Sequence, residues 1–160
     1  MKKLSVKKEH IREMFRSFNN LNVLIIGDVM IDSYMWGKVN RISPEAPVPI
    51  VAVQKRESRL GGAANVAINI KAMGATPLLC SVIGNDRHAE DLLGLMKELS
   101  MDTAGMILSD ERVTTVKTRV IGNNHQLLRV DDEVMHGLSV KEQSEILKAV
   151  KALIEKEKPA

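Results

Sequence analysis

The sequence predicts an α/β protein built on a parallel sheet, and three observations carry this prediction. Residues 22–27 and 76–83 are nearly all apolar and each run ends at or just before a glycine, a pattern typical of parallel strands buried on both faces. A helical pattern lies between the two runs. A second helical pattern and a short third strand at 105–108 follow, and this alternation favours right-handed crossovers within one sheet.

Composition narrows the class of protein. The chain has 160 residues, of which 44% are hydrophobic and 27% charged, and this fits one globular domain with a substantial core. The formal net charge of +3 is mild. With two Phe, one Tyr and one Trp, the chain has too few aromatic side chains for a base-stacking surface. No nucleic-acid partner is therefore expected.

The sequence shows no signal for export, for membrane insertion or for a metal site. No continuous apolar stretch follows the first lysines, and no segment reaches membrane-spanning length. The single Cys80 lies inside an apolar run, which favours a buried structural thiol, and the four His are scattered without metal-ligand spacing. We therefore expect a cytoplasmic protein without a membrane partner and without bound metal of its own.

Helices are predicted at both ends of the chain. Residues 1–20 are expected to form an N-terminal helix capped by Ser5, separate from a domain over 21–160. Its apolar stripe comprises Val6, Ile11, Met14, Phe15 and Phe18. Ser139 is expected to cap a final helix. The apolar stripe of that helix comprises Ile146, Leu147, Val150, Leu153 and Ile154.

A glycine pair, Gly61-Gly62, opens the helical pattern that ends at Met73-Gly74. Glycine lets a ligand approach the main chain closely, and the free N–H groups of the helix start suit a hydroxyl-rich or anionic ligand. Asn65 can both donate and accept hydrogen bonds there. The same residues also fit a tight turn into a core helix, so both interpretations stay open.

Acidic residues follow two of the predicted strands. Asp28 and Asp32 come directly after the first strand, at the edge where open α/β sheets bind ligands, although a turn or cap is an equally simple role. Asp86 follows the strand at 76–83 and is expected to cap the next helix.

The spacing of Gly61-Gly62-Ala63, Asn65, Ala67, Gly74 and Gly84 resembles the first signature of the ribokinase-like (phosphofructokinase B) family of carbohydrate kinases. The resemblance implies a ribokinase-like three-layer α/β sandwich, partial here, with a small β lid. It also implies that Asp32 holds sugar hydroxyls. Met30 stands where ribokinase has an asparagine, which argues against ribose as the substrate.

The segment between the first strand and the glycine pair predicts short strands at 34–36, 38–41 and 49–55, joined by a proline-rich connection that forbids helix. The connection also fits an ordinary rigid surface loop, yet residues 41–49 resemble a segment of the heptose 7-phosphate kinases of this family. The resemblance, which covers roughly residues 22–133, implies transfer of phosphate from ATP to the anomeric hydroxyl of D-glycero-D-manno-heptose 7-phosphate, in ADP-heptose and lipopolysaccharide synthesis.

A hairpin is predicted from strands at 114–121 and 126–131 around a turn rich in Gly and Asn. Alternation places Lys117 and Arg119 on one face, where they are either solvated or, with Arg129, able to reach a substrate phosphate. By resemblance, lid strands near 33–57 and 113–131 cover the sugar and serve as a homodimer contact.

Family members are about twice as long as this chain, and their Gly-Ala-Gly-Asp motif with the catalytic base has no match here. We therefore expect no catalytic residue in this chain, and a catalytic base downstream of Ala160. ATP and Mg²⁺ are expected to bind mainly to a C-terminal half that is absent, so the chain alone should be inactive. Two alternatives stay open: another ribokinase-like sugar or nucleoside kinase, and a non-catalytic module for sugar binding or dimerisation.

Overall fold

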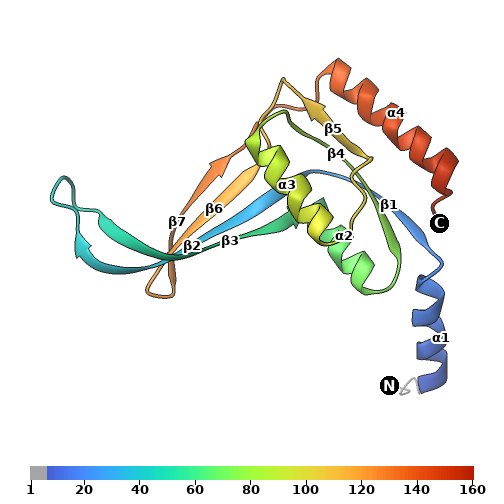
Figure 1. Cartoon of the computed structure of the whole chain (residues 1–160), viewed down its shortest axis with the longest axis horizontal. Coiled ribbons are helices and arrows are strands. Elements are labelled where there is room, and N and C mark those ends of the chain that lie inside the picture. Colours follow the sequence, from blue (N-terminus) through green and yellow to red (C-terminus); the bar gives the residue numbers. More distant parts are fainter. Residues whose placement is uncertain (1–6) are drawn as a thin grey trace, which may run out of the picture.

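The computed structural model describes residues 7–160, so the predicted cap at Ser5 and the stripe position Val6 lie outside the described residues. Helix α1 (Lys8–Phe18) is present and ends at Asn19, and Phe15 and Phe18 pack edge to face with ring centroids 5.4 Å apart. No residue of α1 is buried. Figure 1 shows α1 extending away from the rest of the chain. The division of the chain at residue 20 stays a prediction.

The parallel sheet is confirmed. It contains β1 (Asn22–Ile26), β4 (Thr76–Gly84) and β5 (Met106–Ser109), in the order β1-β4-β5 with all neighbours parallel. Helices α2 (Ala63–Ala72) and α3 (Arg87–Glu98) lie across the sheet from α4 (Val140–Glu157), as Figure 1 shows. The result is a partial three-layer α/β sandwich.

Strand β4 is the centre of this sheet. Its consecutive residues from Leu78 to Ser81 are all at most 4% exposed. Because neighbours in a strand point to opposite faces, both faces of β4 must be covered. Strand β1 differs from the prediction, since it is only half-buried and Ile26 is 57% exposed. The reason is that β1 lies at the sheet edge, with β4 as its one strand partner among residues 7–160.

The lid is a second sheet of four strands in the order β3-β2-β6-β7. It consists of β2 (Val29–Ile42), β3 (Pro49–Gly62), β6 (Val116–Gly122) and β7 (His125–Asp132). The β2/β3 and β6/β7 pairs are antiparallel, whereas β2 and β6 are parallel. Figure 1 shows β2 and β3 as a long ribbon that projects beyond the helices.

The three short strands predicted before the glycine pair were wrong in their boundaries. Residues 34–36 and 38–41 belong to one strand of 14 residues that already includes Asp32. Its register shifts between Trp36 and Gly37, where a Cβ on Gly37 would lie 2.5 Å from the Ala52 carbonyl oxygen. The bulge thus bends the ribbon without interrupting it.

One core joins the lid to the helices. Ile31, Leu60 and Val116 from three lid strands pack with Leu92 and Met96 of α3, and all five are at most 5% exposed. The base of the lid is therefore part of the same hydrophobic core as the α/β layer, while its distal half is not.

Several local signals were predicted correctly. Asn123 and Asn124, both with positive φ, turn the hairpin between β6 and β7, which is what a type I′ turn requires. Gly74, at φ +101°, follows the end of α2. Ser139 caps α4, although only Leu153 of the predicted α4 stripe is fully buried. No helix within residues 7–160 combines the length and the apolar character needed to cross a membrane.

Candidate functional site

Gly61 leaves room for the carboxylate of Asp32. The two residues come from neighbouring strands, with Met30 opposite Gly61 and Asp32 opposite Arg59 in the β2/β3 register. A Cβ on Gly61 would lie 2.5 Å from Oδ2 of Asp32 and 2.8 Å from Cγ of Met30. The structure therefore brings together Asp32 and the glycine pair, as the sequence predicted, but places Asp32 inside a strand and not in a loop.

At Gly62 it is the backbone conformation and the contact with Asp28 that require a glycine. Its φ is +59°, and a Cβ there would collide with the main-chain oxygen of Asp28. That same oxygen accepts a 2.8 Å hydrogen bond from the Ala63 amide, the first of α2. This hydrogen bond joins the start of α2, directly after β3, to the residues that follow β1.

Asp28 lies at the carboxyl end of β1, in a cavity of about 240 Å³ that Val82 of β4 also lines. Met30, Arg112 and His136 contribute to its wall. The Met30 side chain also lies beside the glycine pair, since its Cγ and Cε are 2.8 and 3.1 Å from the positions of a Cβ on Gly61 and on Gly62. This is the strand edge at which open α/β sheets bind ligands.

Asn65 shares a cavity with Arg59, the residue opposite Asp32 in the β2/β3 register. Asn65 is exposed in the first turn of α2, and this cavity of about 320 Å³ is also lined by Leu60, Ile68 and Leu95. Leu60 points into the core, on the opposite face of β3 from Arg59 and Gly61. That Asn65 and Asp32 bind one ligand together therefore stays a prediction.

The predicted cations all lie on the Asp32 face of the lid, and each has a carboxylate partner. Arg119 forms an ion pair with Asp32 (Nη1–Oδ1 2.5 Å), which raises the pKa of Arg119. Lys117 Nζ lies 2.6 Å from Glu133 and 3.0 Å from Asp131, and these hydrogen bonds raise the pKa of Lys117.

Arg129 shares a partner with Lys117. Its Nε and Nη2 atoms donate to the two oxygens of Asp131 at 2.8 and 2.9 Å. Hydrogen bonds from Arg129 and then from Lys117 lower the pKa of Asp131. Arg129 therefore helps to hold Lys117 within the lid, because one carboxylate binds both cations.

Tyr34 is a residue of this face that the sequence analysis did not single out. The guanidinium carbons of Arg59 and Arg119 lie 5.4 and 5.3 Å from its ring centroid, within the range of a cation–π interaction. Trp36 stacks on Tyr34 with ring centroids 6.1 Å apart. The period-two spacing of Asp32, Tyr34 and Trp36 was the signal that could have found this group.

A buried ion pair anchors the wall of the Asp28 cavity. Glu142, 1% exposed, accepts hydrogen bonds from Arg112 (Nε–Oε1 2.7 Å, Nη2–Oε2 3.1 Å), from Ser109 Oγ and from the Ser139 amide. Arg112 is the main reason that the pKa of Glu142 lies far below its usual range. The pair fixes the loop after β5 to the start of α4, and sequence reasoning missed it because 30 residues separate the partners.

Asp86 acts as the predicted cap and also holds this loop. Its Oδ1 accepts a 2.8 Å hydrogen bond from the Ala89 amide of α3, and its Oδ2 accepts one from the Thr114 amide at 2.8 Å. Thr114 Oγ1 in turn accepts from the Gly84 amide. Asp86 is therefore a structural residue that connects three segments, which agrees with the simpler of its possible roles.

Ala160 lies at the opposite end of β1 from Asp28. Its amide donates a 3.0 Å hydrogen bond to the carbonyl oxygen of Asn22, the first residue of that strand. The Asn22 side chain in turn donates to the carbonyl oxygen of Glu157 at 2.8 Å. A residue that follows Ala160 would therefore have to return along the length of β1 to reach the Asp28 edge. The catalytic base expected downstream of Ala160 stays a prediction.

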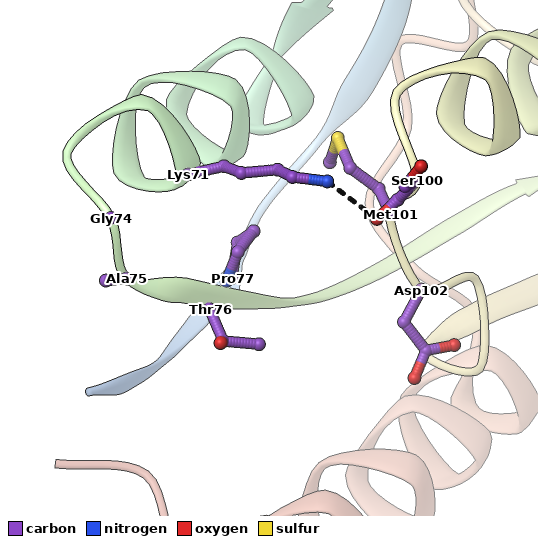
Figure 2. A pocket seen from close by; sticks show the side chains of 8 residues that line it. All are labelled: Lys71, Gly74, Ala75, Thr76, Pro77, Ser100, Met101 and Asp102. Atoms are coloured by element: carbon purple, nitrogen blue, oxygen red, sulfur yellow. Dashed lines mark hydrogen bonds between the residues drawn. The ribbon is translucent and has the colours of Figure 1, made fainter. Parts of the chain in front are cut away.

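A further pocket, of about 400 Å³, lies at the opposite end of the sheet, near the start of β4 (Figure 2). Lys71 points into it, but its amine donates to the carbonyl oxygens of Leu99 and Ser100 at the end of α3. Cations commonly satisfy helix C-termini in this way. We therefore assign this pocket a structural role. Cys80 is fully buried as predicted, and burial raises the pKa of its thiol.

Within residues 7–160, no group of three or more His, Cys, Asp or Glu side chains is arranged to hold a metal ion. The polar face around Asp32 can accept hydroxyl hydrogens and pair with anions. Its described residues offer no metal centre of their own.

Comparison with solved structures identifies the fold. The fold matches a carbohydrate kinase from Agrobacterium tumefaciens (TM-score 0.56, 18% identity, covering 70% of this chain and 35% of the other). It also matches a nucleoside kinase from Methanocaldococcus jannaschii, described as an archaeal member of the ribokinase family (TM-score 0.52, 20% identity, covering 69% and 36%). The fold is thus that of the ribokinase-like kinases.

Residues 20–156 match the model of the pfkB family of carbohydrate kinases, and the chain belongs to that family. Its relatives include the bifunctional protein HldE of Helicobacter pylori strain P12, 45% identical over 117 residues (73% of this chain, 25% of the relative). HldE of Methylobacillus flagellatus is 44% identical over 132 residues (82% and 27%), and HldE of Desulfatibacillum aliphaticivorans is 47% identical over 122 residues (76% and 25%). The chain therefore spans about a quarter of the length of these relatives.

Proposed function

We propose that this chain is the sugar-binding part of an ATP-dependent heptose kinase. Its acceptor would be D-glycero-D-manno-heptose 7-phosphate, phosphorylated at the anomeric hydroxyl in the synthesis of ADP-heptose for lipopolysaccharide. The observation that carries the proposal is the Asp32 carboxylate held against Gly61, at the base of a lid. The identity of 44–47% to bifunctional HldE proteins and the heptose-kinase-like segment at 41–49 support this acceptor over others.

The role of these residues would be positioning. Asp32 keeps Oδ2 beside the Gly61 main chain, where it can accept hydrogen bonds from sugar hydroxyls. Holding the sugar in one orientation places the reacting hydroxyl in line with the phosphoryl donor and removes much of the entropic barrier. The remaining proposed substrate-binding residues are Asp28, Gly62, Asn65, Lys117, Arg119 and Arg129.

The donor side of the reaction requires ATP and Mg²⁺. A fructokinase of the same fold from Xylella fastidiosa has been solved with bound ATP. Residues 7–160 supply no three-ligand group for a metal. We assign the catalytic base to a position downstream of Ala160, and most of the ATP site to the part of the longer relatives that this chain does not match.

The test is binding by the chain itself, measured as a thermal shift, because a ligand that binds the native state raises its apparent stability. Heptose 7-phosphate is expected to raise the melting temperature, and fructose 6-phosphate and adenosine are expected to do so much less. Asp32→Asn should abolish the shift. Asp102→Asn, at the opposite end of the sheet, should leave it unchanged. An equal shift with adenosine, or none with any sugar phosphate, would overturn the proposed acceptor.

The lid has a second face that favours a homodimer. Leu128 and Val130 of β7 lie on the face opposite Asp32 and are 50% and 47% exposed. Burying such side chains against a second copy would be favourable. We propose this face as the contact between two lids, and light scattering with Val130→Lys would test it. The cytoplasmic location expected from the sequence stays a prediction.

A further inference from the structure

Two arginines share one aromatic ring on the Asp32 face of the lid. Side chains of alternate strand residues share a face, and the registers place Arg59 opposite Asp32 and Arg119 beside Tyr34. Both guanidinium carbons lie within 5.4 Å of the Tyr34 ring centroid. The Tyr34 ring attracts each guanidinium group, and it therefore holds two positive charges near each other.

The lid cations differ in how many of their N–H groups are already used. The amine of Lys117 binds two carboxylates, and Arg129 donates twice to Asp131. Arg119, by contrast, donates only through Nη1, to Asp32 and weakly to a main-chain oxygen. Its Nε and Nη2 have no acceptor among the described residues.

Arg59 is also only partly used. Its Nε and Nη2 atoms both contact Oε1 of Glu57, while Nη1 has no acceptor within residues 7–160. Arg59 and Arg119 therefore retain free donors, and they come from β3 and β6, the two strands that flank the strand of Tyr34. A phosphate monoester carries a charge of about −1.5 to −2 and three strong acceptor oxygens, which suits a pair of planar guanidinium donors.

We propose that Arg59 and Arg119, supported by Tyr34, form a subsite for the phosphate group of a phosphorylated sugar. This inference rests on the proposed function, because it takes Asp32 as the group that binds the hydroxyls of the same ligand. Oδ2 of Asp32 stays available for them beside Gly61. The subsite selects a sugar phosphate over a neutral sugar or a nucleoside, and it assigns to Arg59 and Tyr34 a role that the sequence motifs do not indicate.

The chain contains its own reporter for this subsite. Trp36 is the single tryptophan, and it stacks on Tyr34 with an angle of 16° between the rings. Its indole nitrogen is buried without a hydrogen-bond partner among the described residues. A ligand that moves the arginines or Tyr34 will therefore change the tryptophan emission.

The experiment is a fluorescence titration of the purified chain with D-glycero-D-manno-heptose 7-phosphate, with the unphosphorylated heptose and with inorganic phosphate. The phosphorylated sugar is expected to bind at least about tenfold more tightly than the parent sugar, as a charged hydrogen-bonding group allows. Arg59→Gln should remove most of that advantage and leave the affinity for the unphosphorylated heptose unchanged. Arg56→Gln is the matched control, since it changes the charge equally on the other face of the same strand.

Four results would overturn the inference. Equal affinity for the phosphorylated and the unphosphorylated sugar would refute the phosphate subsite but not the sugar site. Equal losses in Arg56→Gln and Arg59→Gln would show a general charge effect. Inorganic phosphate binding as tightly as the sugar phosphate would show a general anion site and not a subsite for a phosphorylated sugar. Absence of binding by either sugar would refute the proposed function as well. If Arg59→Gln does not fold, Arg59→Lys should fold and still lose part of the advantage, because an amine lacks the planar fork.

Discussion

Asp32 and Gly61 face each other across two strands of the lid so closely that residue 61 has no room for a side chain: a Cβ there would lie 2.5 Å from Oδ2 of Asp32. The carboxylate in turn is fixed on its other side by Arg119. The orientation of the Asp32 carboxylate therefore depends both on the absence of a side chain at Gly61 and on the ion pair with Arg119.

Gly61→Ala is expected to displace Asp32 and Met30. Binding of heptose 7-phosphate should weaken by at least about tenfold, and the free energy of unfolding should fall by about 1–3 kcal/mol, as for other overpacked sites. Calorimetric titration and urea unfolding measure the two effects. Gly94→Ala is the control, because a Cβ there meets nothing within 4 Å, and in the middle of α3 it should raise stability by about 1 kcal/mol. Unchanged binding in Gly61→Ala would contradict the role of this contact.

Glu142→Gln is expected to destabilise the protein by about 3 kcal/mol, because it leaves the Arg112 guanidinium without its buried anionic partner. Urea unfolding provides the measurement. Glu155→Gln, on the exposed side of the same helix, should change stability by less than about 0.5 kcal/mol. Similar losses in both variants would show that helix charge, and not the buried pair, is responsible.

Stability should also depend on pH through Glu142. Its pKa is lowered in the folded state from a usual value of 4.5, chiefly by Arg112, so the folded state binds this proton less readily than the unfolded state. The stabilisation is therefore complete above about pH 4.5 and declines as the pH falls below it. Urea midpoints measured across that range should fall less steeply in Glu142→Gln than in the unmodified chain. Parallel curves would exclude Glu142 as the main contributor.

The chain alone is expected to show no kinase activity. The reason is that the Gly-Ala-Gly-Asp motif, which by resemblance carries the catalytic base, has no match in the sequence. The measurement is ATP-dependent phosphorylation of heptose 7-phosphate by the purified 160-residue chain, followed by mass spectrometry. Detectable turnover by the unmodified chain would contradict the assignment of the base to a position downstream of Ala160.

Self-association is expected from the edge of the parallel sheet. Strand β1 has one strand partner among the described residues, and Ile26 at its end is 57% exposed. Unpaired strand edges favour pairing between chains. Light scattering should therefore show oligomers of the isolated chain, reduced in Ile26→Lys. A strict monomer with a sharp two-state melt would contradict this expectation.

Much of the fold could be predicted because its signals are local. The apolar run of β4, the glycine pair before α2 and the two Asn residues of the hairpin turn are short patterns with direct physical causes. The long strand β2 was split in the prediction because its distal half projects beyond the core, so apolar and polar residues do not alternate cleanly there.

The candidate site was predicted less completely, since its contacts join distant segments. Asp32 and the glycine pair were found, but the surroundings of Asn65 depend on how α2 packs against the strands. Arg59 and Arg112 carry no motif, and their partners become apparent only from strand register and from the packing of α4. Long-range pairing of this kind leaves no pattern in one sequence.

The shared core at the base of the lid limits how a ligand could be enclosed. Ile31, Leu60 and Val116 are locked against α3, so the first half of the ribbon cannot swing as a hinged flap. Any closing motion would instead have to come from flexing beyond the register shift at Gly37, with the Asp32 end of the ribbon held in place.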